Sequence, residues 1–140
     1  MAVACRGANC GRVKGKILLL DNDAGVLEGF RALFEHTGIE VYTTSSLLDF
    51  HSLIARHDPD LILVDVNMAT LKGNEIVAAA RNRLTSSMVV LFSGISPIEL
   101  KELSHAAGAD GFLSKMEEPD EILRQVMSWV EQRRRLRGHA

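Results

Sequence analysis

Short, wholly apolar runs alternate with longer amphipathic segments along most of this chain. Runs such as KILLL at 16–20 and LILV at 61–64 are typical of strands that are buried on both faces of a sheet. The segment 24–36 instead repeats its apolar residues at helical spacing, which indicates a helix with one buried face. The pattern predicts strands at 16–20, 39–43, 61–64, 88–92 and 111–114, and helices at 24–36, 46–57, 74–84, 96–107 and from Pro119 onward.

Capping residues support the limits of two predicted helices. Asp23 is placed to cap the helix at 24–36, and Gly38 is expected to stop it. Ser96 and Glu99 have the spacing of a capping box, with Pro97 at the first helical position. The sequence therefore marks helix ends where the apolar periodicity changes.

Five alternations of strand and helix with short connections predict one α/β domain. Such connections specify parallel strands joined by right-handed crossover helices, which cover both faces of the sheet. A length of 140 residues suits one domain of this kind. We expect a flexible tail at 1–15, the folded domain at 16–131, and a basic tail or the start of a linker at 132–140.

Composition places the chain among ordinary globular proteins. Hydrophobic residues make up 46% and charged residues 24%, with a formal net charge of -2. This balance gives no reason to expect nucleic-acid binding by the domain. The basic residues that do cluster are four arginines near the C-terminus, Arg133, Arg134, Arg135 and Arg137. We interpret them as a solvated helix end, with cations beside its negative dipole, rather than as a nucleic-acid site.

The two cysteines, Cys5 and Cys10, both lie in the N-terminal tail. No histidine or further cysteine stands close enough in sequence to complete a four-ligand zinc site. The apolar runs are all shorter than the roughly 18 residues that a membrane span needs, and the first residues are too few for a signal peptide. We therefore expect a cytoplasmic protein with reduced thiols that does not enter membranes.

Distinctive polar side chains follow four of the five predicted strands, at the edge where ligands bind in open parallel sheets. They are Asp21, Asn22 and Asp23 after the first strand, Asp65 and Asn67 after the third, Ser93 after the fourth, and Lys115 after the fifth. Each alone has a commoner explanation, as a helix cap, a turn residue or a solvated lysine. Together, their oxygens suit Mg²⁺, and a carboxylate beside a metal and a lysine could form an acyl phosphate.

Four segments resemble the response-regulator receiver family: KILLLDND, PDLILVDVNMATLKG, MVVLFSG and GADGFLSK. The resemblance runs from about Lys16 to Trp129. It implies a flavodoxin-like fold of five β-α units with strand order 2-1-3-4-5. It also implies a phosphoacceptor at Asp65, Mg²⁺ ligands at Asp21, Asn22, Asp65 and the backbone carbonyl of Asn67, a phosphate-sensing hydroxyl at Ser93, a lysine at Lys115, a switch aromatic at Phe112 and a loop glycine at Gly73.

Three positions depart from the pattern of that family. Asn22 stands where the second of two acidic residues is usual, so we expect weak Mg²⁺ binding. Ala69 and Met116 each replace a usual proline, which affects the geometry of two loops. We expect a trans peptide bond between Lys115 and Met116, because a cis bond before methionine costs roughly 2.5–4 kcal/mol.

The resemblance implies a two-component signalling domain rather than an enzyme. A histidine kinase or phosphotransfer protein would phosphorylate Asp65, after which Ser93 and Phe112 would change position. The face formed by the fourth helix, fifth strand and fifth helix would then change its preference for a downstream protein.

Two other functions are considered beside this one. A degenerate receiver, which binds partners without being phosphorylated, is favoured by Asn22. A hydrolase that uses Asp65 as a nucleophile would need a general base, and none of the five histidines follows a predicted strand.

Overall fold

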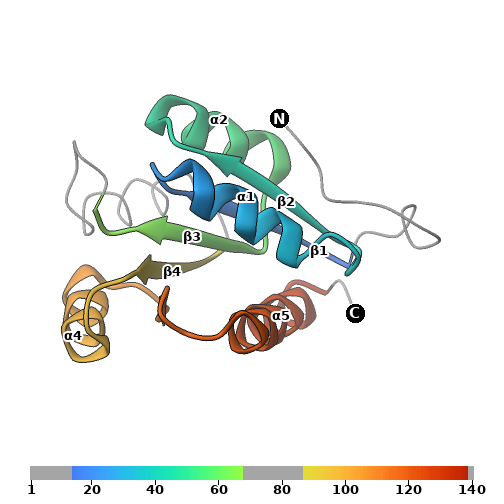
Figure 1. Ribbon diagram of the computed structural model, residues 1–140. Helices are drawn as coiled ribbons and strands as arrows, with labels where there is room; N and C mark the ends of the chain where they lie inside the picture. The colour runs from blue at the N-terminus through green and yellow to red at the C-terminus, as the bar shows by residue number, and fades with distance from the viewer. Residues whose placement is uncertain (1–13, 68–86, 139–140) are drawn as a thin grey trace.

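The computed structural model describes residues 14–67 and 87–138, which form a five-stranded parallel sheet. The strands are β1 (Gly15–Leu20), β2 (Ile39–Thr44), β3 (Leu61–Asp65), β4 (Met88–Ser93) and β5 (Gly111–Ser114). Their order is β2-β1-β3-β4-β5, and Figure 1 labels β2, β1, β3 and β4 in the sheet. The predicted α/β class and strand order are confirmed.

The strand register brings the carboxyl ends of the strands to one edge of the sheet. Leu20 of β1 pairs with Val64 of β3, so the next residues, Asp21 and Asp65, lie at the same height along the two strands. On the other side of β3, Ser93 of β4 pairs with Ser114 of β5. The polar residues that the sequence places after the strands therefore meet at this edge.

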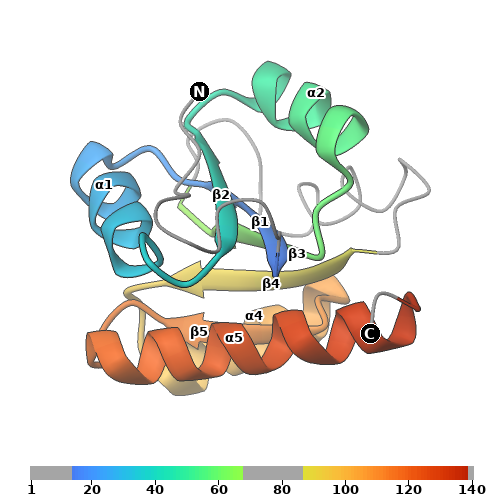
Figure 2. The same ribbon diagram turned by 90° about the vertical axis from the view of Figure 1, so that its right-hand side faces the viewer.

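Four helices occur within the described residues: α1 (Ala24–Leu33), α2 (Leu47–His57), α4 (Pro97–Ala107) and α5 (Pro119–Leu136). The helix predicted at 74–84 lies outside the described residues. Apolar residues of α1 and α5 pack against one face of the sheet, and those of α2 and α4 against the other. Figure 2 shows α5 running along one side of the molecule. The core thus consists of two apolar layers separated by the sheet, as expected for an α/β domain.

Helix caps agree with the sequence at α1 and α4, except at the end of α1. The side chain of Asp23 accepts from two backbone N–H groups of the first turn of α1, and Ser96 accepts from the N–H of Glu99. However, α1 ends at Leu33 rather than at Gly38. Gly38 has a φ of 84° and forms the turn into β2, so its positive φ serves the next connection.

Helix α5 is longer than the sequence indicated. It continues to Leu136, past the expected domain limit at residue 131, and β1 begins one residue earlier than expected, at Gly15. Arginine is a good helix former, so the run of arginines extends the helix instead of leaving it as a tail. None of the helices in the two described ranges is long and apolar enough to cross a membrane.

Candidate functional site

All five strands end in the same kind of turn, which shapes the functional edge of the sheet. A polar residue that ends each strand, or directly follows it in the case of β1, accepts a hydrogen bond from the backbone N–H two positions later. The pairs are Asp21 with Asp23 (2.9 Å), Thr44 with Ser46 (3.0 Å), Asp65 with Asn67 (3.1 Å), Ser93 with Ile95 (3.2 Å) and Ser114 with Met116 (3.0 Å). These Asx and Ser/Thr turns fix the direction in which the chain leaves the sheet.

Two buried carboxylates and one lysine form the centre of the site. The Nζ atom of Lys115 lies 2.6 Å from Asp21 Oδ2 and 3.5 Å from Asp65 Oδ1. Asp21 is fully buried and Asp65 is 2% exposed. The ammonium also lies 5.5 Å from the centre of the Phe92 ring, where a cation is attracted by the ring face. The structure therefore brings together the three charged residues that the sequence places after β1, β3 and β5.

Burial raises the pKa of Asp65 above its ordinary value. The backbone N–H of Asn67 opposes this shift, the negative charge of Asp21 adds to it, and Lys115 again lowers the pKa. The carboxyl group thus lies in a desolvated environment in which a nearby positive charge has a large effect.

The remaining predicted site residues lie around this centre. Ser93 is buried at the end of β4, and Phe112 is half-buried against the apolar layer that α2 and α4 cover. Asn22 and Asn67 are exposed at the ends of β1 and β3. The peptide bond between Lys115 and Met116 is trans as expected, since the described residues contain no cis bond. Ala69 and Gly73 lie outside the described residues.

The oxygen donors at this edge are of the kind that Mg²⁺ uses, although the described residues contain no group of three or more acidic, histidine or cysteine side chains. Asp21 Oδ2 is buried and receives no hydrogen bond within the described residues; its contact is the ion pair with Lys115. Asp65, the amide of Asn22 and the carbonyl of Asn67 would add further hard oxygen donors, and Mg²⁺ uses one or two carboxylates together with retained waters. Lys115 already balances part of the carboxylate charge, so the site attracts a cation less strongly than a site with three acidic residues.

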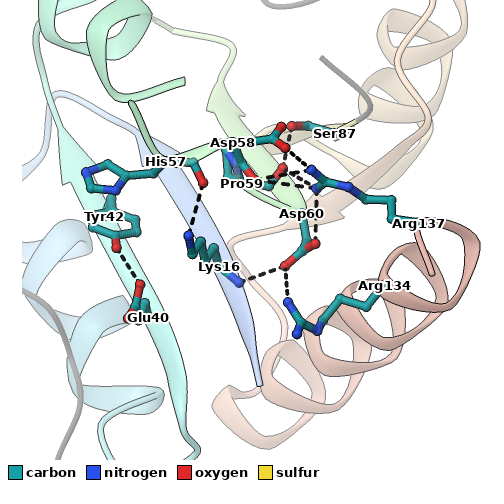
Figure 3. A network of polar contacts seen from close by, with 10 residues as sticks. All are labelled: Lys16, Glu40, Tyr42, His57, Asp58, Pro59, Asp60, Ser87, Arg134 and Arg137. Carbon is teal, nitrogen blue, oxygen red and sulfur yellow. Dashed lines mark hydrogen bonds and ion pairs between the residues drawn. The ribbon is translucent and has the colours of Figure 1, made fainter. Parts of the chain in front are cut away.

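A second polar cluster lies at the opposite end of the sheet, and the sequence analysis missed it. Asp60, just before β3, is buried and accepts from the backbone N–H of Lys16 at 2.9 Å. Its carboxylate also lies 3.3 Å from Arg134 Nη1 and 3.1 Å from Arg137 Nη1 (Figure 3). This end of the sheet is thereby fastened to the last turn of α5.

Arg137 makes further contacts with the loop that precedes β3. Its guanidinium group contacts the carboxylate of Asp58 and the backbone carbonyls of Asp58 and Pro59 (Figure 3). Arg135 instead pairs with Glu131 on the surface of α5. The interpretation of the four arginines as a solvated helix end is therefore wrong for Arg134 and Arg137. Proximity in sequence gives no sign of this pairing, because 74 to 77 positions separate the partners.

Two hollows lie beside helices α5 and α4. One, of about 240 Å³, lies between α1 and α5 and is lined by Gly29, Phe30, Lys115 and Ile122, among others. The other, of about 760 Å³, lies over α4 and β5, where Ile98, His105 and Phe112 contribute to its wall. Ile98 is 75% exposed, and charged residues such as Lys101 and Glu102 line the same hollow.

Comparison with known proteins gives a family match and several relatives. A family model described as response regulator receiver domain matches residues 17–127. Cell cycle transcriptional regulator CtrA from Caulobacter vibrioides is 29% identical over 125 residues, which cover 89% of this chain and 53% of CtrA. Cell cycle response regulator CtrA from Brucella abortus is 27% identical over the same shares of the two chains. The chain thus spans about half the length of these curated relatives.

Solved structures agree in fold. A CheY-like response regulator receiver domain protein from Methanospirillum hungatei superimposes with a TM-score of 0.75 at 21% identity, covering 86% of this chain and 97% of that one. Chemotaxis response regulator CheY4 of Vibrio cholerae gives a TM-score of 0.73 at 24% identity, covering 82% and 98%. At these identities the likeness shows the fold alone.

Proposed function

The chain belongs to the response regulator receiver domain family of two-component systems, and we propose that it accepts a phosphoryl group on Asp65. The observation that carries this proposal is the position of Asp65, which is buried at the end of the central strand β3 and lies 3.5 Å from Lys115. The donor would be a histidine kinase or a phosphotransfer protein, as in the family. In this role the chain is a signalling domain rather than an enzyme.

The hydrogen bonds of Asp65 indicate which oxygen reacts. Oδ1 accepts the N–H of Asn67 and faces Lys115, so Oδ2 is the oxygen that bonds to phosphorus. As this bond forms, the bond from phosphorus to the donor's imidazole nitrogen breaks and leaves its electron pair on that nitrogen. Lys115 balances negative charge on the phosphoryl oxygens, which is the main requirement of such a transfer.

Mg²⁺, when bound, would neutralise charge on the phosphoryl oxygens and orient them. Asp21, Asn22, Asp65 and the backbone carbonyl of Asn67 would hold it. The assignment is supported by the two buried carboxylates of Asp21 and Asp65, which both lie within 3.5 Å of Lys115 and whose charge a single ammonium offsets only in part.

Signalling would proceed from the site to the surface over α4 and β5. Ser93 would follow the phosphoryl oxygens, and Phe112, which lines the hollow there, would change its exposure. We propose that a downstream protein binds the face formed by α4, β5 and α5 in the cytoplasm. We propose no nucleic-acid partner for this domain; Arg134 and Arg137 pair with the buried Asp60 instead.

Asn22 favours a second candidate, a degenerate receiver that binds partners without phosphorylation. An amide oxygen brings no charge to the metal site, so Mg²⁺ and the phosphoryl group would both be held less well. In this case the arrangement of Asp21, Asp65 and Lys115 would only stabilise one conformation of the domain.

Incubation with acetyl phosphate and Mg²⁺, followed by intact-mass measurement, separates the two candidates. We expect one added phosphoryl group on the protein and none on Asp65→Asn. A phosphoryl group that persists on Asp65→Asn would show a different acceptor. No addition to the protein or to Asn22→Asp, with both variants folded, would overturn the proposal and favour the degenerate receiver.

A further inference from the structure

The turn that follows β5 is held by a side chain within the strand. Ser114 is 6% exposed, and its Oγ accepts the backbone N–H of Met116 at 3.0 Å. Lys115 stands between the two residues, so this hydrogen bond forms a turn with Lys115 at its centre and restrains the lysine's backbone. The turn therefore sets the direction from which the Lys115 side chain starts toward Asp21 and Asp65.

This hydrogen bond depends on the absence of proline at position 116. Proline has no backbone N–H, so a proline there would leave Ser114 Oγ without this donor. The side chain of Met116 is 78% exposed, so the residue offers the turn its N–H rather than an apolar contact. Four other strands close with the same type of turn, which shows that the bond at Ser114 belongs to a repeated local geometry.

Within the described residues, two backbone hydrogen bonds also restrain this turn. The N–H of Lys115 donates to the carbonyl of Ser93 at 2.8 Å, and the N–H of Glu117 donates to the carbonyl of Ser114 at 3.3 Å. Glu118, the N-cap residue of α5, makes no side-chain capping bond. The Ser114 hydroxyl therefore supplies a restraint on the turn that the start of α5 does not.

We propose that Ser114 is a positioning residue for Lys115, acting through its hydrogen bond to the N–H of Met116. The Ser114 hydroxyl restrains the backbone on both sides of Lys115. It thereby holds the ammonium group near the carboxylates of Asp21 and Asp65. The proposal rests on the proposed function of Asp65 for its effect on phosphorylation. Its effect on Lys115 itself is independent of that function.

A double-mutant cycle tests the proposal. Ser114→Ala should slow phosphorylation by acetyl phosphate about threefold to tenfold, the worth of one ordinary hydrogen bond. In the metal-free, unphosphorylated protein it should also shift the NMR signals of the Lys115 side chain toward those of a solvated lysine. In a Met116→Pro background, where the N–H is absent, the same Ser114→Ala change should have no effect on either quantity. Ser114→Thr, which keeps the hydroxyl, should restore both.

Ser104→Ala is the matched control. Ser104 is also buried, and its hydroxyl donates to the carbonyl of Gly111 at 3.0 Å, at the other end of β5. Its loss should lower stability without moving the Lys115 signals. Unchanged Lys115 signals in Ser114→Ala, or equal effects of that change with and without the Met116→Pro substitution, would overturn the proposal. If Met116→Pro does not fold, the Lys115 signals of Ser114→Ala, compared with those of Ser114→Thr and Ser104→Ala, still test the role of the Ser114 hydroxyl. If the protein accepts no phosphoryl group at all, the proposed function fails, and the NMR signals decide the role of Ser114 alone.

Discussion

Lys115 lies closer to Asp21 than to the proposed phosphoacceptor, with 2.6 Å between Nζ and Asp21 Oδ2. The carboxylate of Asp21 is fully buried, and this ion pair compensates its charge. Lys115 thus has a structural role in the resting protein, before any phosphoryl group is present. Phosphorylation of Asp65 would add a competing negative charge for the same ammonium group.

Loss of Lys115 should destabilise the fold through Asp21. We expect Lys115→Met to lower the free energy of unfolding by roughly 1–3 kcal/mol, because it leaves a buried charge without a partner. In an Asp21→Asn background the same change should cost clearly less. Urea denaturation at neutral pH measures the cost of Lys115→Met in each background. Lys101→Met, on the exposed side of α4, is the control and should change the free energy of unfolding little. An equal cost in both backgrounds would show that the ion pair is not the cause.

Asn22→Asp should strengthen magnesium binding. It adds a charged oxygen donor to a site where Lys115 offsets part of the negative charge, so we expect binding tighter by roughly tenfold to a hundredfold. A Mg²⁺ titration followed by backbone NMR signals measures this. Gln132→Glu, at an exposed position of α5 away from the site, is the matched amide-to-carboxylate control and should leave Mg²⁺ binding unchanged. If Asn22→Asp binds Mg²⁺ no more tightly than the unmodified protein, charge at position 22 does not limit the affinity.

Leu63 in the middle of β3 should contribute strongly to stability. Its side chain is fully buried between the sheet and the layer formed by α1 and α5, so Leu63→Ala leaves a cavity and should cost roughly 2–5 kcal/mol. Leu48→Ala on α2, where the side chain is 81% exposed, is the control and should cost less than about 0.5 kcal/mol. Chemical denaturation of the two variants should separate them clearly; similar losses would contradict the packing of β3.

Arg137 should hold the last turn of α5 to the loop before β3. Its guanidinium group is 11% exposed and contacts two carboxylates and two backbone carbonyls, so Arg137→Ala should cost roughly 1–3 kcal/mol and speed amide exchange in that turn. Arg137→Lys should lose less stability than Arg137→Ala but remain less stable than the unmodified protein, because a lysine ammonium lacks the planar set of donors of a guanidinium group. Arg135→Ala removes an exposed pair with Glu131 and should have little effect. Equal exchange rates in the two alanine variants would contradict this role.

His57 should make stability depend on pH. Its ring stacks on Tyr42 at 4.0 Å between centres (Figure 3), and its Nε2 is buried with no hydrogen-bond partner in the described part of the chain. Burial lowers the pKa of His57 below 6.5; the positive charges of Lys16 and Arg56 lower it further, and Glu40 opposes them. The unfolded chain therefore takes up the proton first as the pH falls. The stability that neutral His57 contributes is complete above about pH 6.5 and is lost as the pH falls through its lowered pKa.

A matched substitution isolates this effect. His57→Phe keeps a stacked ring but cannot titrate, so it should lose less stability than the unmodified protein between about pH 7.5 and about pH 5. His105→Gln, at an exposed position of α4, should leave the loss unchanged. Parallel stability curves for the protein and His57→Phe would show that His57 does not contribute.

The sequence by itself determined the α/β class, the parallel sheet and the location of the site, and the family resemblance added the strand order. Continuous apolar runs predict doubly buried strands, and a helix between each two successive strands makes these strands parallel, so their carboxyl ends share one edge. Asp21, Asp65 and Lys115 could therefore be placed together without coordinates. Helix caps such as Asp23 and Ser96 were also predictable, because they depend on neighbours within three positions.

Only the tertiary structure decided which charged groups pair. That Lys115 lies nearer Asp21 than Asp65 depends on side-chain directions at the strand ends, which apolar periodicity does not encode. The pairing of Asp60 with Arg134 and Arg137 joins residues 74 and 77 positions apart, and it requires the packing of α5 across the sheet. Patterns along the chain report which face of an element is buried, whereas an ion pair between elements needs their relative position to within a few tenths of an ångström.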